Sequence, residues 1–325
     1  MENFKEAEQL SLPPKRTILF PLYQQEEWRE VLEKLEEISE IRIRVNQPVL
    51  IYWKGEEFYL SVKGSLTKSS HNCRSFTFQR LRELLEYWCE NSRYAYEAQI
   101  KKGYLTLRNG HRAGLCGETV LTKDEITNLK YISSVNLRIA HQIKNIAKPI
   151  LPHIYHKGRI KNLLILSPPG AGKTTLLRDT VRLISEGNEW GEGKNIALID
   201  ERKEIAACYQ GIPQLDVGKR TDIMDGCPKK EGMKMVLRAM SPQVIAVDEL
   251  QGEEEVKLIL QIVRCGASII ATAHADSFLE WKEKENNRQL INAEIFCLII
   301  ELSKENGRFK ARIYEEGRKE PCCVF

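Results

Sequence analysis

The residues best suited to chemistry in this sequence lie in the stretch LLILSPPGAGKTTLLRD, residues 163–179. An apolar run predicts a buried strand at 163–166, a tight loop follows at 167–172, and a helix rich in Leu and Arg begins at Lys173. This order is typical of a phosphate-binding loop, in which backbone N–H groups, a helix N-terminus and one ammonium group face several negative charges. The stretch therefore predicts a nucleotide site.

Each position of this loop has an expected task. Gly170 and Gly172 let the backbone approach the phosphates closely, and the ammonium group of Lys173 reaches the β- and γ-phosphates. The hydroxyl group of Thr174 is placed to coordinate Mg²⁺. The expected nucleotide-binding residues are Ser167, Pro168, Pro169, Gly170, Ala171, Gly172, Lys173, Thr174 and Thr175.

One position departs from the usual GxxxxGK[ST] pattern, because Ser167 stands where the first glycine is expected. Serine is small, and Pro168 and Pro169 stiffen the turn that follows, so the departure is mild. The alternative is a glycine-rich strand-to-helix turn whose lysine is merely solvated. Strand, loop, GKTT and helix follow in the required order, and this order favours the nucleotide site.

A second acidic motif, VIAVDEL, is an apolar strand that ends in two carboxylates, Asp248 and Glu249. A strand followed by Asp-Glu is common on its own, but it gains meaning downstream of a phosphate-binding loop. Asp248 is placed to hold Mg²⁺ directly or through water, and Glu249 to orient and deprotonate the attacking water. The pair predicts nucleotide hydrolysis.

Two further strand ends carry polar groups. The stretch ALIDERKEIA gives Asp200, an expected ligand of the metal, and Glu201, an expected catalytic group; SIIATAHADS delivers His274. The alternatives are a solvated strand terminus for the acidic pair and a structural role for the histidine. Because parallel strand ends share one edge of a sheet, where ligands bind, we expect these residues near Mg²⁺, water and the γ-phosphate.

Phosphoryl transfer often also uses an arginine, because the transition state of this reaction carries negative charge spread over the phosphoryl oxygens. A guanidinium group from a neighbouring subunit often compensates that charge. The candidates are Arg138, Arg112, Arg220 and Arg238, each with a surface or ion-pair alternative. The sequence does not rank them.

The composition is that of a globular protein of 325 residues with 42% hydrophobic content, long enough for two domains. A formal net charge of +4 without a strongly basic block gives no sign of a nucleic-acid groove, and we do not expect nucleic acid as a partner. The nine cysteines show no metal-finger spacing. The N-terminus has no apolar signal core and no run approaches the roughly 18 apolar residues of a membrane span, so we expect a cytoplasmic protein.

The elements before residue 146 predict one α+β domain over residues 1–145. Amphipathic spacing predicts helices at Gln24–Ser39 and Thr77–Glu90. Strands are predicted at Ile41–Val45, Val49–Trp53 and Ser134–Ile143, with a third early strand at EFYLSV and a hairpin that turns at Asn109-Gly110.

Residues 146–325 have a different pattern, with strands separated by helices. Short, continuous apolar runs indicate parallel strands covered on both faces, and the fold class is therefore α/β with a mostly parallel sheet. The strands are expected at Leu163–Leu166, Ile196–Ile199, Val244–Val247 and Ser268–Thr272, and the helices at Lys173–Ser185 and Glu253–Cys265. A closing hairpin is expected around Asn306-Gly307.

The chain resembles the stage III sporulation protein AA family of endospore-forming bacteria. The matching stretches are EIRIRVNQPVLI, GHRAGLCGETV, VNLRIAHQI, SPPGAGKTTLLRD, LIDERKEIAACYQG, VGKRTDIMDGCPKKEGM, MSPQVIAVDELQ and ATAHA, between about Glu40 and Ala275. Their combination is far more specific than the phosphate-binding loop alone.

That family is similar to the hexameric ATPases of type II and type IV secretion and of type IV pilus systems. The resemblance implies an α+β N-terminal domain, a RecA-like P-loop NTPase core and ATP bound between them. It implies an acidic box at Asp200-Glu201, a histidine box at His274, and an arginine, Arg138, that reaches the nucleotide. It also implies a hexameric ring, a role in the channel between mother cell and forespore, and peripheral docking to a membrane-anchored partner.

Three hypotheses follow. The first is an oligomeric, peripheral ATPase that converts Mg-ATP hydrolysis into domain motion for a trans-envelope complex. The second is an ATPase that depends on single-stranded nucleic acid, with IRIRV as a positive sheet face; such an activity would depend steeply on salt. The third is a scaffold with little turnover, in which ATP only sets the oligomeric state.

Overall fold

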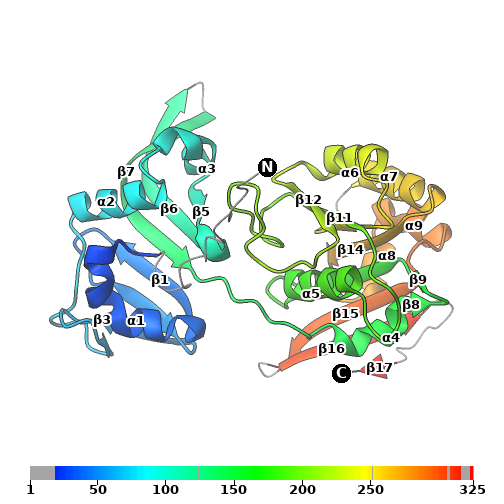
Figure 1. Ribbon diagram of the computed structural model, residues 1–325, viewed down its shortest axis with the longest axis horizontal. Helices are drawn as coiled ribbons and strands as arrows, with labels where there is room; N and C mark the ends of the chain where they lie inside the picture. The colour runs from blue at the N-terminus through cyan, green and yellow to red at the C-terminus, as the bar shows by residue number, and fades with distance from the viewer. Residues whose placement is uncertain (1–18, 123–124, 251, 306–307, 316–322, 325) are drawn as a thin grey trace, which may run out of the picture. The chain divides into compact units, whose positions relative to one another are not determined.

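The computed structural model describes residues 19–122, 125–250, 252–305, 308–315 and 323–324. The chain divides into two compact units, Met1–His141 and Gln142–Phe325 (Figure 1). In the part of the chain that is described, no helix has both the length and the apolar character needed to cross a bilayer.

The first unit is built on an antiparallel sheet with the strand order β4-β3-β2-β1-β7-β6-β5. The strands are β1 Ile38–Arg44, β2 Leu50–Trp53, β3 Glu56–Leu60, β4 Leu66–Thr67, β5 Tyr104–Thr106, β6 Arg112–Thr122 and β7 Glu125–Arg138. The helical elements are η1 Leu22–Trp28, α1 Arg29–Glu33, η2 Leu35–Glu37, α2 Phe78–Trp88, η3 Arg93–Tyr96, α3 Glu97–Lys101 and η4 Arg108–Gly110. The predicted α+β character of this part is confirmed.

The prediction of one helix over Gln24–Ser39 is wrong. The segment forms three short helical pieces, and the chain is already in strand β1 at Ile38. Trp28 is fully buried and stacks on Phe20 with ring centroids 3.9 Å apart. The end of the segment belongs to the sheet, because Ile38 pairs with Trp53 of β2, and such pairing outweighs small differences in helix propensity.

Two other predictions for this unit fare differently. The hairpin at Asn109-Gly110 is confirmed: both residues have positive φ, 60° and 78°, and β5 pairs with β6 across the turn. The strand predicted at Ser134–Ile143 is longer at its start and ends sooner, as β7. Its early part is polar, so alternation does not reveal it, but it pairs with β6 from Glu125 onward.

The second unit has a mostly parallel sheet in the order β12-β11-β13-β14-β10-β15-β16-β17. The strands are β10 Leu163–Ser167, β11 Ile196–Asp200, β12 Thr221–Asp225, β13 Val244–Val247, β14 Ser268–His274, β15 Leu298–Glu305, β16 Arg308–Glu315 and β17 Cys323–Val324, with β8 Tyr155–His156 and β9 Arg159–Ile160 in a separate small pair. Strands β15 and β16 form the predicted closing hairpin, whose expected turn at Asn306-Gly307 lies outside the described residues.

Both faces of this sheet are buried, as continuous apolar strands require. Alternate residues of β10 enter two different cores: Leu163 and Ile165 face one, Leu164 and Leu166 the other. The first core is covered by η5 Lys148–Ile150, α4 Leu151–Ile154 and α5 Lys173–Glu186. The second is covered by α6 Lys229–Ala239, α7 Glu253–Arg264, α8 Phe278–Glu283 and α9 Arg288–Asn292, with η6 Glu285–Asn287 between the last two along the chain.

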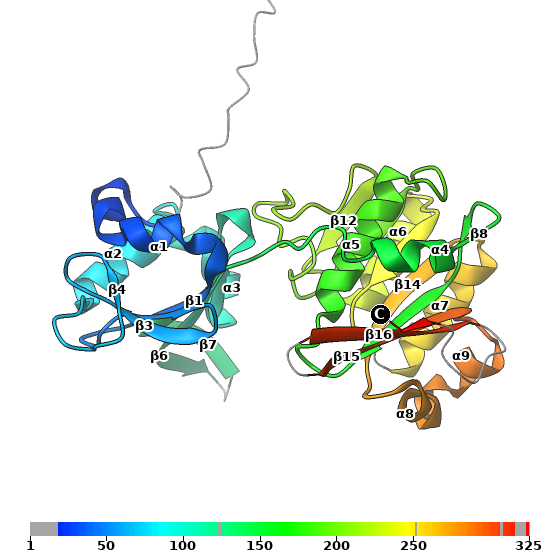
Figure 2. The same cartoon turned by 90° about the horizontal axis from the view of Figure 1, so that it is seen from below.

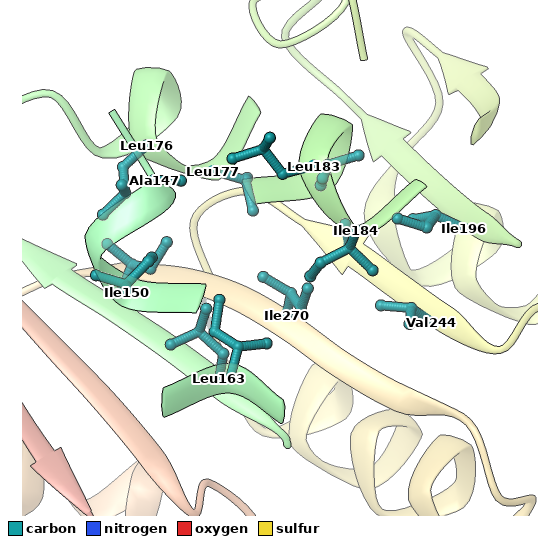
Figure 3. Close-up of a cluster of buried hydrophobic side chains, with 14 of the residues drawn as sticks. Ala147, Ile150, Leu163, Leu176, Leu177, Leu183, Ile184, Ile196, Val244 and Ile270 are labelled. Atoms are coloured by element: carbon teal, nitrogen blue, oxygen red, sulfur yellow. The ribbon is translucent and has the colours of Figure 1, made fainter. Parts of the chain in front are cut away.

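Figure 2 shows the helices over the first of these cores, and Figure 3 shows its side chains. Helices α4 and α5 lie next to each other over the sheet (Figure 2). Ile184 of α5 faces the strands that carry Ile270 and Val244, and all three side chains are buried (Figure 3). The packing of α5 against the sheet therefore fixes the position of its N-terminus, where the loop at 167–172 ends.

The last residues of the predicted first domain belong to the second compact unit and bond to it. Gln142 exchanges two hydrogen bonds with the backbone of Asp216, and Lys144 pairs with the Asp216 carboxylate at 2.5 Å. Asn145 accepts a hydrogen bond from Arg182 of α5. The boundary between the compact units thus falls after His141, and the division at 145/146 stays a prediction for the functional domains.

Shortening Ile270 to Ala should destabilise the second unit by about 2–5 kcal/mol, because the side chain is fully buried in the central strand β14. The measurement is the free energy of unfolding in denaturant. Leu279→Ala is the control, since Leu279 is 73% exposed on α8. Equal effects of the two substitutions would contradict this description of the core.

Candidate active site

The loop between β10 and α5 has the backbone of a phosphate cradle. Gly170 and Gly172 adopt φ of 75° and 87°, in the left-handed region that favours glycine. A Cβ on Gly170 would meet nothing within 4 Å, so backbone conformation and not space selects glycine there. Gly172 caps α5 without a side-chain hydrogen bond, which leaves the first N–H groups of the helix available to an anion.

Ser167, the unusual residue of the loop, ends strand β10 and is fully buried. Its hydroxyl group donates to the carbonyl of Pro168 at 2.8 Å. The Ser167 hydroxyl group therefore has a hydrogen-bond acceptor within the loop, although the residue is buried. This geometry is compatible with the phosphate-binding shape.

Three predicted residues meet beside the loop. Lys173 Nζ lies 3.2 Å from each ring nitrogen of His274 and 4.0 Å from Glu249 Oε1, and His274 Nε2 lies 2.8 Å from the same oxygen. A neutral imidazole that donates from Nε2 to Glu249 leaves Nδ1 as an acceptor for Lys173. Loop, acidic motif and histidine thus form one polar cluster, supplied by the ends of β10, β13 and β14.

Thr272 of β14 fixes the two acidic residues relative to each other. Its hydroxyl oxygen accepts from the backbone N–H of Glu249 at 2.9 Å and donates to Asp248 Oδ1. The other carboxylate oxygen of Asp248 accepts from the hydroxyl group of Thr174 at 3.3 Å. Thr174 and Asp248 therefore lie together, and a Mg²⁺ ion held by both stays a prediction.

The backbone at Glu249 is under unusual constraint. Glu249 has φ of 47°, uncommon for a residue with a side chain. The ammonium group of Lys229, itself buried, donates to the Glu249 carbonyl and lies 3.6 Å from Glu201 and 3.5 Å from Glu255. Lys229 thus connects Glu201, which follows β11, with the acidic motif after β13, a link that the sequence did not predict.

Asp200 has a different environment from the one predicted. It is buried, and its carboxylate accepts from the backbone N–H groups of Glu204, Ile205 and Ala206 at 2.8–3.0 Å. Burial raises the pKa of this carboxyl, and the N–H groups of Ala206 and Glu204 oppose the shift. These contacts support a role in shaping the loop after β11, and its role as a metal ligand stays a prediction.

The arginine candidates are dispersed. Arg138 is exposed on β7 of the first unit, and Arg112 lies over the ring of Tyr104. Arg220 donates to the carbonyl of Ser185 at 3.0 Å, and Arg238 is exposed on α6. A role in catalysis for Arg138 therefore stays a prediction.

Another arginine, Arg202, does reach the cluster: its Nη2 atom lies 2.7 Å from Glu249 Oε2. The sequence offered a signal for it, because Arg202 directly follows the Asp200-Glu201 strand end. With Arg202, the carboxylate of Glu249 has three basic side chains within 4.0 Å.

The residues present fit a nucleoside triphosphate with Mg²⁺. Mg²⁺ is usually held by one or two carboxylates together with substrate phosphates, not by a cage of protein ligands. Thr174 and Asp248 offer such a partial shell, and no cluster of three or more His, Cys, Asp or Glu suited to a metal occurs among the described residues. Burial lowers the pKa of Lys173, and the charges of Asp248 and Glu249 oppose that shift.

An apolar pocket of about 260 Å³ adjoins the phosphate-binding loop. Ala171, Gly172, Thr175 and Leu176 form one wall. Side chains from the segment before β10 and from the β15–β16 hairpin complete it, among them Ile146, Ile150 and Leu302. Its position beside Thr175, one residue beyond the expected Mg²⁺ ligand, suits the apolar part of a nucleotide.

The fold is now defined: the second unit is a RecA-like core, and the chain shares its fold with the ATPase DotB and the pilus retraction motor PilT. The X-ray structure of the ATPase DotB of Legionella pneumophila matches with a TM-score of 0.56 at 16% identity, over 93% of this chain and 84% of that one. The pilus retraction motor PilT with bound ADP matches with a TM-score of 0.60 at 17% identity, over 90% and 83%.

The chain belongs to the family described as sporulation stage III, protein AA, whose model matches residues 24–320. It is 39% identical to stage III sporulation protein AA of Bacillus subtilis (strain 168) over 271 residues, which cover 83% of this chain and 84% of that protein. The expected family and fold class are thereby confirmed.

Replacing Thr272 by Val should cost about 1–3 kcal/mol of unfolding free energy, because it leaves the N–H of Glu249 without its acceptor. Thr180→Val is the matched control: Thr180 is equally buried, and its hydroxyl group only donates to a helix carbonyl, that of Leu176. Denaturant unfolding and amide exchange at Glu249 measure the effect. If the control lost as much stability and Glu249 exchange stayed slow, the bridging role of Thr272 would be refuted.

Proposed function

We propose that this protein is a Mg²⁺-dependent ATPase whose hydrolytic cycle moves its domains. One observation carries the proposal: a phosphate-binding loop, a hydroxyl–carboxylate pair and a buried carboxylate meet at the ends of three adjacent parallel strands. This edge of an open α/β sheet is where ligands bind.

Each residue has a defined task in the proposal. The loop N–H groups and Lys173 bind the β- and γ-phosphates, and the apolar pocket takes the adenine base. Mg²⁺, held by Thr174 and Asp248, neutralises charge on the phosphates. Glu249 accepts a proton from a water molecule while the oxygen of that water bonds to the γ-phosphorus. At the same time the bond between the γ-phosphorus and the β–γ bridging oxygen breaks, and ADP leaves.

The remaining predicted residues support this chemistry. His274 contacts both Lys173 and Glu249. Loss of the γ-phosphate would therefore change the contacts of His274 at the end of β14. Glu201 is linked through the ammonium group of Lys229 to the Glu249 backbone. Arg138 is proposed to reach the nucleotide from the first unit, and Asp200 to act near the metal.

The biological setting is proposed from the family. A sporulation stage III protein with the fold of secretion and pilus ATPases suits a motor for the channel between mother cell and forespore. We propose that it works as a cytoplasmic hexameric ring, peripheral at the membrane through a membrane-anchored partner. On the IRIRV face, which the alternative of a nucleic-acid-dependent ATPase would use, one of the two arginines, Arg42, already pairs with Glu40.

Lys173→Ala should abolish ATP binding and hydrolysis, because it removes the positive charge that faces the phosphates. Glu249→Gln should still bind ATP and hydrolyse it about 10²–10⁴ times more slowly, since a general base contributes that much. Phosphate release and binding of a fluorescent ATP analogue are the measurements. Lys161→Ala serves as control, because Lys161 pairs with Glu315. Near wild-type turnover of Glu249→Gln would remove Glu249 as the base.

Assembly into a ring is tested by the mass of the purified protein with and without a slowly hydrolysed ATP analogue. We expect the mass of a hexamer when the analogue and Mg²⁺ are present. Phosphate release measured on the same sample separates a motor from a scaffold, which would assemble with almost no turnover. A monomer under every condition would contradict the ring.

A further inference from the structure

Arg202 has a contact that the proposed hydrolytic cycle does not yet use. Its guanidinium group lies 2.7 Å from Glu249 Oε2, yet that oxygen has no aligned hydrogen bond. The contact is therefore an ion pair and not a directed hydrogen bond. The Arg202 side chain is 55% exposed, against 11% for that of Glu249. The guanidinium end of the pair is exposed and its contact is not aligned, so Arg202 can turn to another anion while the buried carboxylate keeps His274 as a partner.

The backbone that carries Arg202 is fixed although its side chain is exposed. Asp200, two residues earlier, is buried and binds the N–H groups of Glu204, Ile205 and Ala206, which follow Arg202. The loop is thus fastened on both sides of this arginine. A long side chain on a fixed base can move its charge between two nearby anions at little cost to the fold.

The charges around Glu249 favour a second anion. Lys173 and Arg202 are both close to this single carboxylate, and the positive charge of Arg202 contributes to lowering the pKa of Lys173. Lys173 is the residue expected to bind the β- and γ-phosphates. A terminal phosphate bound there would lie near the Arg202 guanidinium group. Arginine forms charge-assisted, often bidentate hydrogen bonds with phosphate oxygens, whereas its contact with Glu249 is not aligned.

We propose that Arg202 is a γ-phosphate sensor that exchanges Glu249 for the terminal phosphate of the bound nucleotide. This inference rests on the proposed ATPase function and extends it. A triphosphate draws Arg202 away from Glu249 and frees Oε2 of that carboxylate for the attacking water. A diphosphate has no terminal phosphate at this point, and the Arg202–Glu249 pair persists. Arg202 thereby couples readiness of the base to the presence of the γ-phosphate.

The test compares two ligands on the full chain. With Mg²⁺ present, Kd is measured for a fluorescent, slowly hydrolysed ATP analogue and for fluorescent ADP. Arg202→Ala should weaken the ATP analogue about 10-fold to 100-fold, the value of a charge-assisted hydrogen bond, and leave ADP unchanged. Arg202→Lys, which keeps the charge, should recover part of the loss. Lys203→Ala, whose lysine pairs with Asp225 at 2.5 Å, should change neither ligand.

A double-mutant cycle tests the exchange itself. Since Glu249 competes with the phosphate for Arg202, the loss caused by Arg202→Ala for the ATP analogue should be larger in the Glu249→Gln background than in the wild type. Equal losses in the two backgrounds would refute the exchange. Equal weakening of ATP analogue and ADP by Arg202→Ala, or no weakening of either, would refute the sensor while leaving the ATPase intact. A wild-type protein that bound neither ligand would overturn the proposed function and this inference with it.

Discussion

The carboxylate of Glu249 lies where only 9% of the residue is exposed, and a charge in such a place requires partners. Lys173, His274 and Arg202 supply them, while Thr272 and Lys229 hold the Glu249 backbone in a left-handed conformation. Removing one partner leaves part of the Glu249 charge uncompensated. Breaking a buried ion pair in this way costs more stability than the intact pair contributes. The residues of the site are therefore interdependent.

The parallel sheet makes this interdependence possible. Strand β14 pairs with β10 on one side and with β13 on the other, so the ends of the three strands lie in neighbouring positions. Ser167 stands opposite His274 in that register, which brings the start of the phosphate-binding loop next to the histidine. A shift of register by one residue would turn each side chain to the opposite face. Core packing on both faces thus sets the geometry of the polar cluster.

Much of this arrangement is written in local sequence patterns. Continuous apolar runs predicted strands β10, β11, β13 and β14, and the rule that parallel strand ends share an edge predicted that Asp248, Glu249 and His274 would meet. These predictions succeeded because buried parallel strands and glycine-rich loops have strong compositional requirements. The helix predicted over Gln24–Ser39 failed because the end of the segment pairs with strand β2, and periodicity does not contain that pairing.

The sequence did not predict which groups the side chains of the Asp200–Arg202 segment would contact. Asp200 and Glu201 are adjacent in the same motif, yet one binds backbone N–H groups of the following turn and the other faces Lys229. Arg202, the next residue, turns to Glu249. Three successive side chains take three different partners because the fold of one loop directs them, and side-chain type alone does not distinguish these outcomes.

The most direct test of the proposed ATP site is an experimental structure of the full chain with Mg²⁺ and a slowly hydrolysed ATP analogue. We expect the phosphates in the loop formed by residues 167–174, with Lys173 Nζ moved from His274 and Glu249 to phosphate oxygens. We also expect the metal between the Thr174 hydroxyl group and Asp248. An analogue bound elsewhere, with the contacts of Lys173 to His274 and Glu249 unchanged, would contradict the proposed site.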